Sequence, residues 1–330
     1  MSDHDKQEDI NFVETSMFQQ NMKKAKRKQN LKYIGIGTLT TITVLLLLYL
    51  MGSWVLQTRL HSDDWTLYEI RGANFQTSGT QMYYTPFSAI TETTYIKEMK
   101  DRPIVWDKKR VDIPMFGSKS TIDSFESSAS EYSETNQRRI SYNGHNNERN
   151  VAFYYPSITY EFLPEELQTA TNLDENKIVE VALSFDQSYT PEQLEEKLDS
   201  SLVKWLWVDT SNKSELQKDR ETINNLGKDK SKEHRHVPTA SGQGAVGFQV
   251  NEESYQKAAD SFLESMEALD KQSKYEGLYK EIQDALKGQS GNRQVEISGA
   301  VITGTPSELE RYLNKDFIRA STIGATIDQY

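Results

Sequence analysis

Two serine–lysine pairs have the spacing of a catalytic motif. Ser254-Tyr-Gln-Lys257 and Ser201-Leu-Val-Lys204 match the Ser-x-x-Lys pattern of penicillin-recognising enzymes, in which the serine is the nucleophile. The companion motifs Ser-Asp-Asn and Lys-Thr-Gly are absent, and a chain rich in serine and lysine contains such pairs by chance. We therefore expect both pairs to be structural.

Three further groups have residue types that could do chemistry. His234-Arg-His236 could bind a metal ion, but no third ligand lies nearby in the sequence. Gly242-Gln-Gly244-Ala-Val-Gly247 has the spacing of a dinucleotide-binding loop, but no predicted strand precedes it. The pair Glu195-Glu196 lies on a helix face predicted to be solvated. We predict that the protein is not an enzyme and binds no cofactor or metal, and an active site assembled from distant residues is the alternative left open.

A long apolar segment organises the rest of the chain. The 26 residues from Tyr33 to Thr58 contain no Asp, Glu, Lys or Arg. A bilayer core needs roughly 20 apolar residues in a helix, so 33–58 is predicted to be a transmembrane helix. Six basic residues within positions 23–32 precede it, which predicts a cytoplasmic N-terminus and an extracellular C-terminal part. A cleaved signal peptide is the alternative, but Ser53-Trp-Val-Leu56 offers no convincing cleavage site.

The charge and the absence of cysteine limit the partners and the compartment. The chain has 38 basic and 49 acidic residues, of which residues 1–32 hold seven and five, so 31 and 44 remain outside with a net charge of −13. Nucleic-acid surfaces are basic and clustered, so we expect no direct contact with nucleic acid. The absence of cysteine favours a surface without a disulfide-forming compartment, as in Gram-positive bacteria.

The cytoplasmic tail, residues 1–32, contains an apolar stripe at helical spacing. The stripe continues to Ala25, and its candidate partner-binding residues are Ile10, Val13, Met17, Phe18 and Met22. Two interpretations compete for this amphipathic helix. It could lie on membrane lipid at the basic flank, or its apolar face could dock into a groove on a cytoplasmic protein.

The part outside the membrane is predicted to be α+β. Residues 59–150 form a membrane-proximal, β-rich part, with short strands at 81–87, 104–106 and 110–113 and a polar loop or linker at 118–150. Residues 151–330 form a distal domain. Trp205 and Trp207 share one strand face, which predicts core packing, with a binding platform as the alternative.

The distal domain contains a sequence pattern that occurs twice. In both 178–208 and 295–327 a strand leads into Thr-Pro-x-x-Leu-Glu-x-x-Leu and then into a second strand. Thr190 and Thr305 are predicted N-caps, each followed by proline and by Gln193 or Glu308 in a capping box. Apolar stripes at 255–269 and 275–286 predict a helical pair. The expected fold is an α+β ectodomain with two β-α-β units and a helical pair, for which a ferredoxin-like arrangement is one option.

Three stretches together resemble the sigma factor regulator family, whose members are membrane-bound proteins of Gram-positive bacteria. They are residues 18–28 directly before the apolar run, Val181 to Glu192 with Trp205 to Asp209, and Ile302 to Leu309 with the closing segment Ala320 to Tyr330. They cover about a third of the chain, in the family's order.

The resemblance implies a transmembrane anti-sigma factor that acts in a stress response. Its tail would hold an extracytoplasmic-function sigma factor inactive, and its ectodomain would govern release. Because a tail this short buries little surface, the membrane helix or a second small membrane protein is expected to add affinity. The alternative is a cell-envelope scaffold or binding module whose tail is only an anchor.

Overall fold

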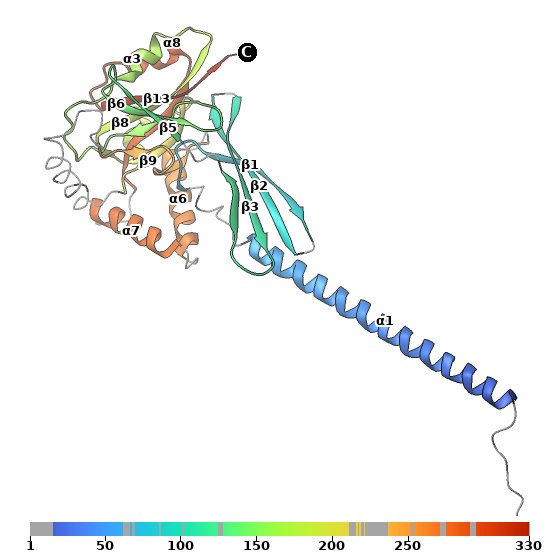
Figure 1. Ribbon diagram of the computed structural model, residues 1–330. Helices are drawn as coiled ribbons and strands as arrows, with labels where there is room; N and C mark the ends of the chain where they lie inside the picture. The colour runs from blue at the N-terminus through green and yellow to red at the C-terminus, as the bar shows by residue number, and fades with distance from the viewer. Residues whose placement is uncertain are drawn as a thin grey trace, which may run out of the picture.

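The computed structural model describes residues 16–61, 67, 70–85, 87–100, 102–124, 128–210, 216, 218, 221, 237–251, 254–270, 275–290 and 295–329. A long N-terminal helix, a membrane-proximal sheet and a distal α+β domain follow one another in space (Figure 1). The sheet lies between the end of the helix and the distal domain, so it joins the two.

Helix α1 (Ser16–His61) is one uninterrupted helix that includes both the basic run and the predicted span. At about 1.5 Å per residue its 46 residues extend about 69 Å, which is more than twice the thickness of a bilayer core. Side chains from Phe18 to Met51 are exposed, and the helix is long and apolar enough to cross a membrane. The hydroxyls of four threonines donate to carbonyls one turn earlier, which satisfies them within an apolar helix; these are Thr38, Thr40, Thr41 and Thr43.

The membrane-proximal sheet is antiparallel, with strand order β1-β2-β3-β4. Its strands are β1 (Gln76–Tyr84), β2 (Ser88–Met99), β3 (Arg102–Pro114) and β4 (Ser120–Ser124). The two short strands predicted at 104–106 and 110–113 are parts of the single long strand β3. The β-rich character predicted for this part of the chain is therefore confirmed, with longer strands than the sequence pattern indicates.

The distal sheet has the strand order β11-β9-β12-β8-β13, and all neighbours are antiparallel. The bounds are β8 (Lys177–Tyr189), β9 (Val203–Val208), β11 (Val246–Gln249), β12 (Ile297–Gly304) and β13 (Ile318–Asp328). Since β8 and β9 both run antiparallel to β12, they are parallel to each other with β12 between them. By the same argument β12 and β13 are parallel, with β8 between them.

The two repeated segments, 178–208 and 295–327, begin their helices in the same way. Thr190 precedes α4 (Pro191–Glu195) and Thr305 precedes α8 (Pro306–Leu309), and each threonine forms a complete capping box with the side chain three residues later. The predicted caps and prolines are confirmed. A 3-10 helix, η3 (Glu310–Tyr312), extends α8 toward β13.

Helices cover one face of the distal sheet. The helices are α3 (Glu166–Thr171), α6 (Tyr255–Asp270) and α7 (Glu276–Ser290), and both predicted stripes face the core. The other face buries Trp205 and Trp207 against Phe153 of β7 (Ala152–Phe153), which pairs with β10 (Ala240–Ser241). The rings of Phe153 and Trp207 stack with centroids 4.9 Å apart. The tryptophans therefore belong to the core and form no exposed binding platform.

The prediction of a polar loop or linker at 118–150 is wrong. This segment contains β4 and a hairpin of β5 (Ser128–Ser133) and β6 (Arg138–Asn143). Its polar composition hid the strands because an ion pair holds the hairpin in place of an apolar face. Arg138 donates from Nε and Nη2 to the two carboxylate oxygens of Glu166 in α3, each at 2.9 Å. Both side chains are buried, so the hairpin packs against the distal domain.

Candidate functional site: the β2–β3 hairpin

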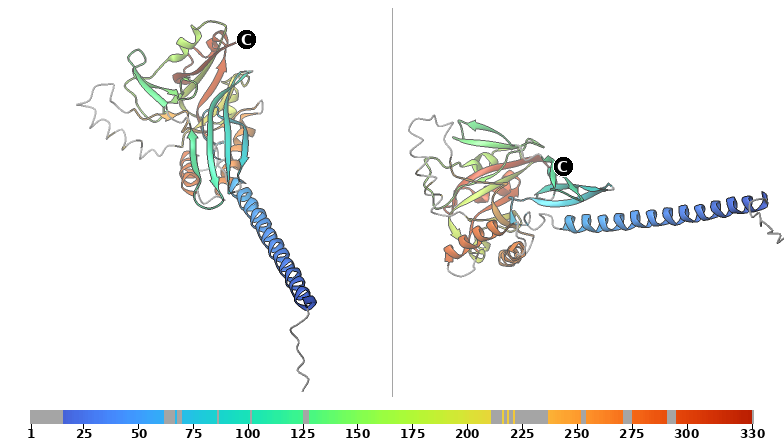
Figure 2. Two further views of the ribbon diagram at one scale, coloured as in Figure 1. Left: turned by 45° about the vertical axis from the view of Figure 1, so that its right-hand side comes forward. Right: turned by 60° about the horizontal axis from the view of Figure 1, so that its bottom comes forward.

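The β2–β3 hairpin contacts helix α1 at one end and the distal domain at the other (Figures 1 and 2). Ser88 pairs with Pro114 at the helix end, and Met99 pairs with Arg102 at the distal end. Strands of 12 and 13 residues at about 3.3 Å each span about 40 Å. The paired strands therefore form a continuous connection between α1 and the distal domain.

A buried ion pair fixes the distal end of the hairpin. Lys97 Nζ of β2 lies 2.7 Å and 3.0 Å from the two carboxylate oxygens of Glu180 in β8. The two side chains are only 1% and 0% exposed. Glu180 also accepts hydrogen bonds from the Asn74 side chain at 3.1 Å and the Ala325 amide at 3.1 Å. A buried carboxylate needs such partners, and here they come from three separate segments of the chain.

Aromatic rings surround the Lys97 ammonium. It lies 3.9 Å from the ring centroid of Trp106 and 5.3 Å from that of Phe75, so it makes cation–π contacts with both. Burial lowers the pKa of Lys97 because desolvation outweighs the attraction of Glu180. The pair is therefore sensitive to loss of either partner, since each charge depends on the other for its place in the core.

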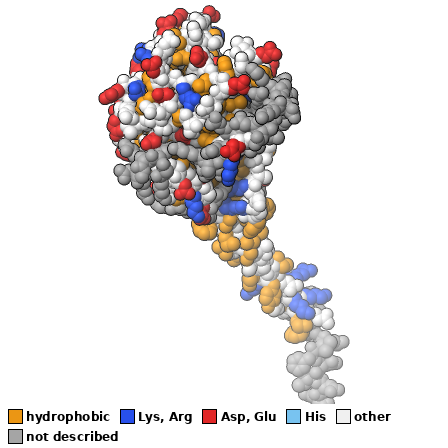
Figure 3. Space-filling model, turned by 90° about the vertical axis from the view of Figure 1, so that its left-hand side faces the viewer, with side chains coloured by type: hydrophobic (Ala, Val, Ile, Leu, Met, Phe, Trp, Pro, Cys, Tyr) orange, Lys and Arg blue, Asp and Glu red, His pale blue; other side chains and the backbone are white. Residues whose placement is uncertain are grey.

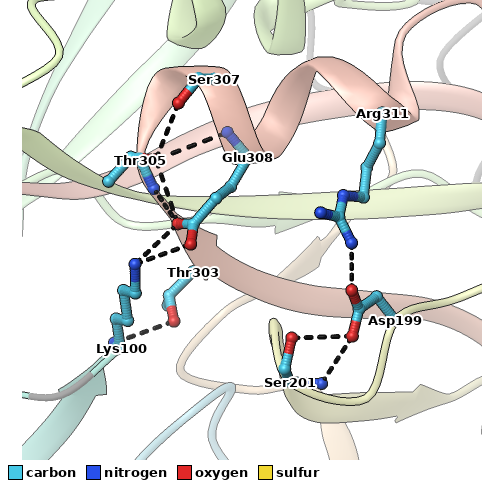
Figure 4. A network of polar contacts seen from close by, with 8 residues as sticks. All are labelled: Lys100, Asp199, Ser201, Thr303, Thr305, Ser307, Glu308 and Arg311. Carbon is cyan, nitrogen blue, oxygen red and sulfur yellow. Dashed lines mark hydrogen bonds and ion pairs between the residues drawn. The ribbon is translucent and has the colours of Figure 1, made fainter.

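A second contact joins the hairpin turn to α8 (Figure 4). Lys100 has a positive φ of 57° at the turn, its amide donates to the Thr303 hydroxyl at 3.0 Å, and its Nζ lies 2.7 Å from Glu308 Oε1. Burial alone would raise the pKa of Glu308, but hydrogen bonds from Lys100 and Thr305 outweigh it and hold the pKa below its usual value. The turn is thus tied to the capping box that starts α8.

An ion pair of Arg311 and Asp199 joins the two repeated segments, 178–208 and 295–327, near this turn (Figure 4). Hydrogen bonds from Ser201 lower the pKa of Asp199, so its carboxylate stays charged opposite the guanidinium. The part of the distal domain that contacts the hairpin turn is therefore itself held together by polar contacts.

The other end of the hairpin holds the end of helix α1. Arg59 donates to three carbonyls of the β3–β4 turn, those of Pro114 at 2.5 Å, Met115 at 3.3 Å and Gly117 at 2.5 Å. Leu60 packs with Ala89 of β2 and Ile113 of β3. Gly52, Leu56 and Leu60 recur every four residues, which places them on one helix face, and all three are buried. Helix α1 is therefore packed against the sheet over its last turns.

A pocket of about 450 Å³ lies beside the hairpin, between the two parts of the molecule. Its walls include Arg71, Tyr95, Trp106, Lys109 and Gln243. No group of three or more His, Asp or Glu side chains suited to a metal ion occurs among the described residues. The pocket therefore offers both charged and aromatic side chains.

The structure places the five predicted partner-binding residues differently. Phe18 and Met22 lie one turn apart on α1 and are 56% and 51% exposed. Met17 belongs to the same helix, but its side chain lies outside the described residues, as do Ile10 and Val13 altogether. The described part of the candidate surface is thus an exposed apolar pair directly before the basic run.

The catalytic-looking motifs have structural roles where they are described. Ser254 accepts a hydrogen bond from the Lys257 amide at 3.2 Å and so caps α6, while Ser201 donates to Asp199 at 2.7 Å. Gly247 lies in β11, where a Cβ would collide with the Trp205 ring. Glu195 accepts from the Tyr255 amide at 2.7 Å. The pair His234 and His236 lies outside the described residues.

Sequence patterns missed the buried charges on which this site depends. Glu180 lies in the predicted strand that begins at residue 178, and nothing near Lys97 or Arg138 marks those two residues as buried. Their partners are 83 and 28 residues away along the chain. One signal was available: β8 has apolar residues on both faces around Glu180, which is typical of a strand covered on both sides.

These features define an α+β domain that a paired-strand hairpin joins to one long apolar helix, which is long and apolar enough to cross a membrane. Residues 171–325, just under half of the chain, match the family model described as sigma factor regulator C-terminal, which supports the resemblance to the sigma factor regulator family. The match begins at the last residue of α3 and ends within β13, and the family that it describes suggests an anti-sigma role and implies a sigma factor partner. Searches of curated proteins and of solved structures found no match.

Proposed function

We propose that the protein is a membrane-bound anti-sigma factor that holds an extracytoplasmic-function sigma factor inactive through its cytoplasmic tail. The observation that carries the proposal is the family match over residues 171–325. It is supported by the exposed pair Phe18 and Met22, which lies on α1 before the basic run. An apolar helix face of this kind fits a groove on a partner protein.

Inhibition would combine occlusion and tethering. The tail covers a surface that the sigma factor needs for transcription, and the membrane helix keeps the complex away from DNA. The N-terminus is cytoplasmic and the distal domain is extracellular in this proposal, as the basic flank at 23–32 favours. The same flank would lie on anionic lipid, so lipid contact and sigma binding use adjacent parts of one helix.

The ectodomain would govern release through the β2–β3 hairpin. Arg59 ties the hairpin to α1 and Lys97 ties it to the distal sheet, so a change in the distal domain is carried to the membrane helix. We also propose the domain limits 59–150 and 151–330. The ferredoxin-like arrangement for the distal domain is supported by the order of β9, β12, β8 and β13.

Replacing both Phe18 and Met22 with Asp should release the sigma factor. Burying such side chains contributes about 1.5–3 kcal/mol each, so their loss should weaken binding at least about tenfold. The measurement is a reporter of the sigma factor's regulon, at matched protein level. Expression should rise toward that of a deletion strain.

The control is Gln20→Asp, which adds a charge about 200° around the helix from either side chain, compared with Phe18→Asp alone. Unchanged reporter output from the double variant, or equal effects of the two single variants, would show that this face does not dock.

A second candidate function is a cell-envelope scaffold whose tail is only an anchor. The pocket of about 450 Å³ beside the hairpin favours it, because Arg71 and Lys109 offer charge and Trp106 offers an aromatic wall to an external ligand. Deleting residues 2–22 would then leave the phenotype of the cell intact.

A further inference from the structure

Large aromatic side chains gather at the base of the membrane-proximal sheet. We call them the aromatic collar; its members are Trp54, Tyr83, Tyr84, Phe87 and Phe116. Phe87 and Phe116 are 73% and 79% exposed, which is unusual for phenylalanine in a folded protein. Figure 3 shows hydrophobic side chains continuing from the helix onto the base of the folded part.

Trp54 of the collar lies on α1 itself, and the other four members lie in or beside two turns that are joined at the end of α1. The Met115 amide donates to the Phe87 carbonyl at 2.7 Å, which joins the β3–β4 turn to the β1–β2 turn. Arg59 donates to the Pro114 and Gly117 carbonyls on either side of Phe116. The two turns are therefore attached to the helix, which fixes the position of the collar along the helix axis.

The β3–β4 turn contacts α1 at a position within the apolar run of the helix. The Met115 side chain packs so closely on Gly52 that a Cβ there would collide with it. Gly52 is six residues before Thr58, the last residue of the uncharged run, which places the turn about 9 Å below the end of that run. Residues 33–52 still supply 20 residues, or about 30 Å, which matches a bilayer core.

The charge of the collar segments differs from that of the rest of the exterior. Residues 76–91 contain no charged residue, and residues 113–122 contain only Lys119. The part of the chain after residue 58 has a net charge of −13, so most of its surface is repelled by anionic headgroups. The collar is a place where this acidic domain can touch lipid without that repulsion.

We propose that the aromatic collar lies in the headgroup layer of the leaflet on the side of the folded domain. Trp and Tyr rings prefer this layer, and Phe87 and Phe116 would reach toward the acyl boundary. The membrane boundary then lies near Gly52, and the bilayer holds the base of the β2–β3 hairpin. The inference rests on α1 as the membrane span and is independent of what the tail binds.

The absence of cysteine allows a direct test on the full-length protein. Phe87→Cys and Phe116→Cys are each labelled with an environment-sensitive fluorophore and reconstituted into vesicles of phosphatidylcholine and phosphatidylglycerol. Phe162→Cys is the control, because Phe162 is an exposed phenylalanine of the distal domain. Labels at 87 and 116 should shift to shorter wavelength and be quenched by lipids that carry a nitroxide near the headgroup, and the label at 162 should do neither.

The outcome that would overturn the proposal is a label at 87 and 116 that behaves like the label at 162. Dilution with protein-free lipid distinguishes lipid from a second copy of the chain. Quenching and shift should stay constant on dilution, whereas a shift that disappears would mean that another copy covers the collar and would also refute the proposal. Circular dichroism of each variant checks that its fold is retained.

Discussion

Replacing Lys97 with Met should lower the free energy of unfolding by about 3–5 kcal/mol, because the carboxylate of Glu180 then stays buried without its countercharge. The two remaining donors to Glu180, Asn74 and the Ala325 amide, are neutral and cannot replace the ammonium. The measurement is chemical denaturation of the full-length protein in mild detergent, followed by tryptophan fluorescence. Trp106, Trp205 and Trp207 are buried and report loss of the core.

The double variant Lys97→Met with Glu180→Gln should recover most of that loss. The glutamine keeps an acceptor for the Ala325 amide, and no uncompensated charge remains in the core. Lys280→Met is the matched control, because it removes a solvent-exposed ion pair with Glu276, and exposed pairs contribute little to stability. Equal effects of Lys97→Met and Lys280→Met would contradict the view that the hairpin is anchored by a buried charge.

The second large effect is expected at Arg138. Arg138→Met removes the two hydrogen bonds to the buried Glu166, and the expected loss is about 3 kcal/mol. The lower end of the range applies because the Ile323 amide still donates to Glu166 at 2.8 Å and Arg149 lies 3.8 Å from it. Hydrogen exchange should rise selectively in residues 128–143, since this pair holds the β5–β6 hairpin to α3.

Arg139 supplies a control at the next position. Its side chain is exposed, so Arg139→Met should change the free energy of unfolding by no more than about 0.5 kcal/mol. If Arg138→Met and Arg139→Met give the same exchange pattern, the hairpin does not depend on the buried pair.

Features with local physical causes were predictable from the sequence. The capping boxes at Thr190 and Thr305 depend on residues three positions apart, and the stripes of α6 and α7 depend on helical periodicity. The apolar run predicted a helix able to span a membrane. Each of these signals lies within one element, so one sequence is enough to read it.

The features that sequence patterns missed depend on distant partners. Glu180 lies in a predicted strand, but its ion pair with Lys97 forms only when the β2–β3 hairpin packs on the distal sheet. The segment 118–150 looks like a loop because its hairpin is held by Arg138 and Glu166 in place of an apolar face. Such pairs leave no period in the sequence, since their register is set by how two sheets pack.

The partner-binding residues predicted in the tail are a separate matter from the hairpin. Phe18 and Met22 are exposed on the helix that the pattern predicted, and docking of a sigma factor there stays a prediction. The aromatic collar has no signature of its own, because Tyr83, Tyr84 and Phe87 fit a buried strand equally well. Their exposure follows from the turn that places them beside α1.

The most direct test of the central claim is a pull-down of the full-length protein in mild detergent, beside a version that lacks residues 2–22. Bound proteins are identified by mass spectrometry, and the variant with Phe18→Asp and Met22→Asp serves as a third sample. The account predicts that a sigma factor is captured by the full-length protein and lost from the other two. Capture of no sigma factor by the full-length protein, or equal capture by all three, would contradict it.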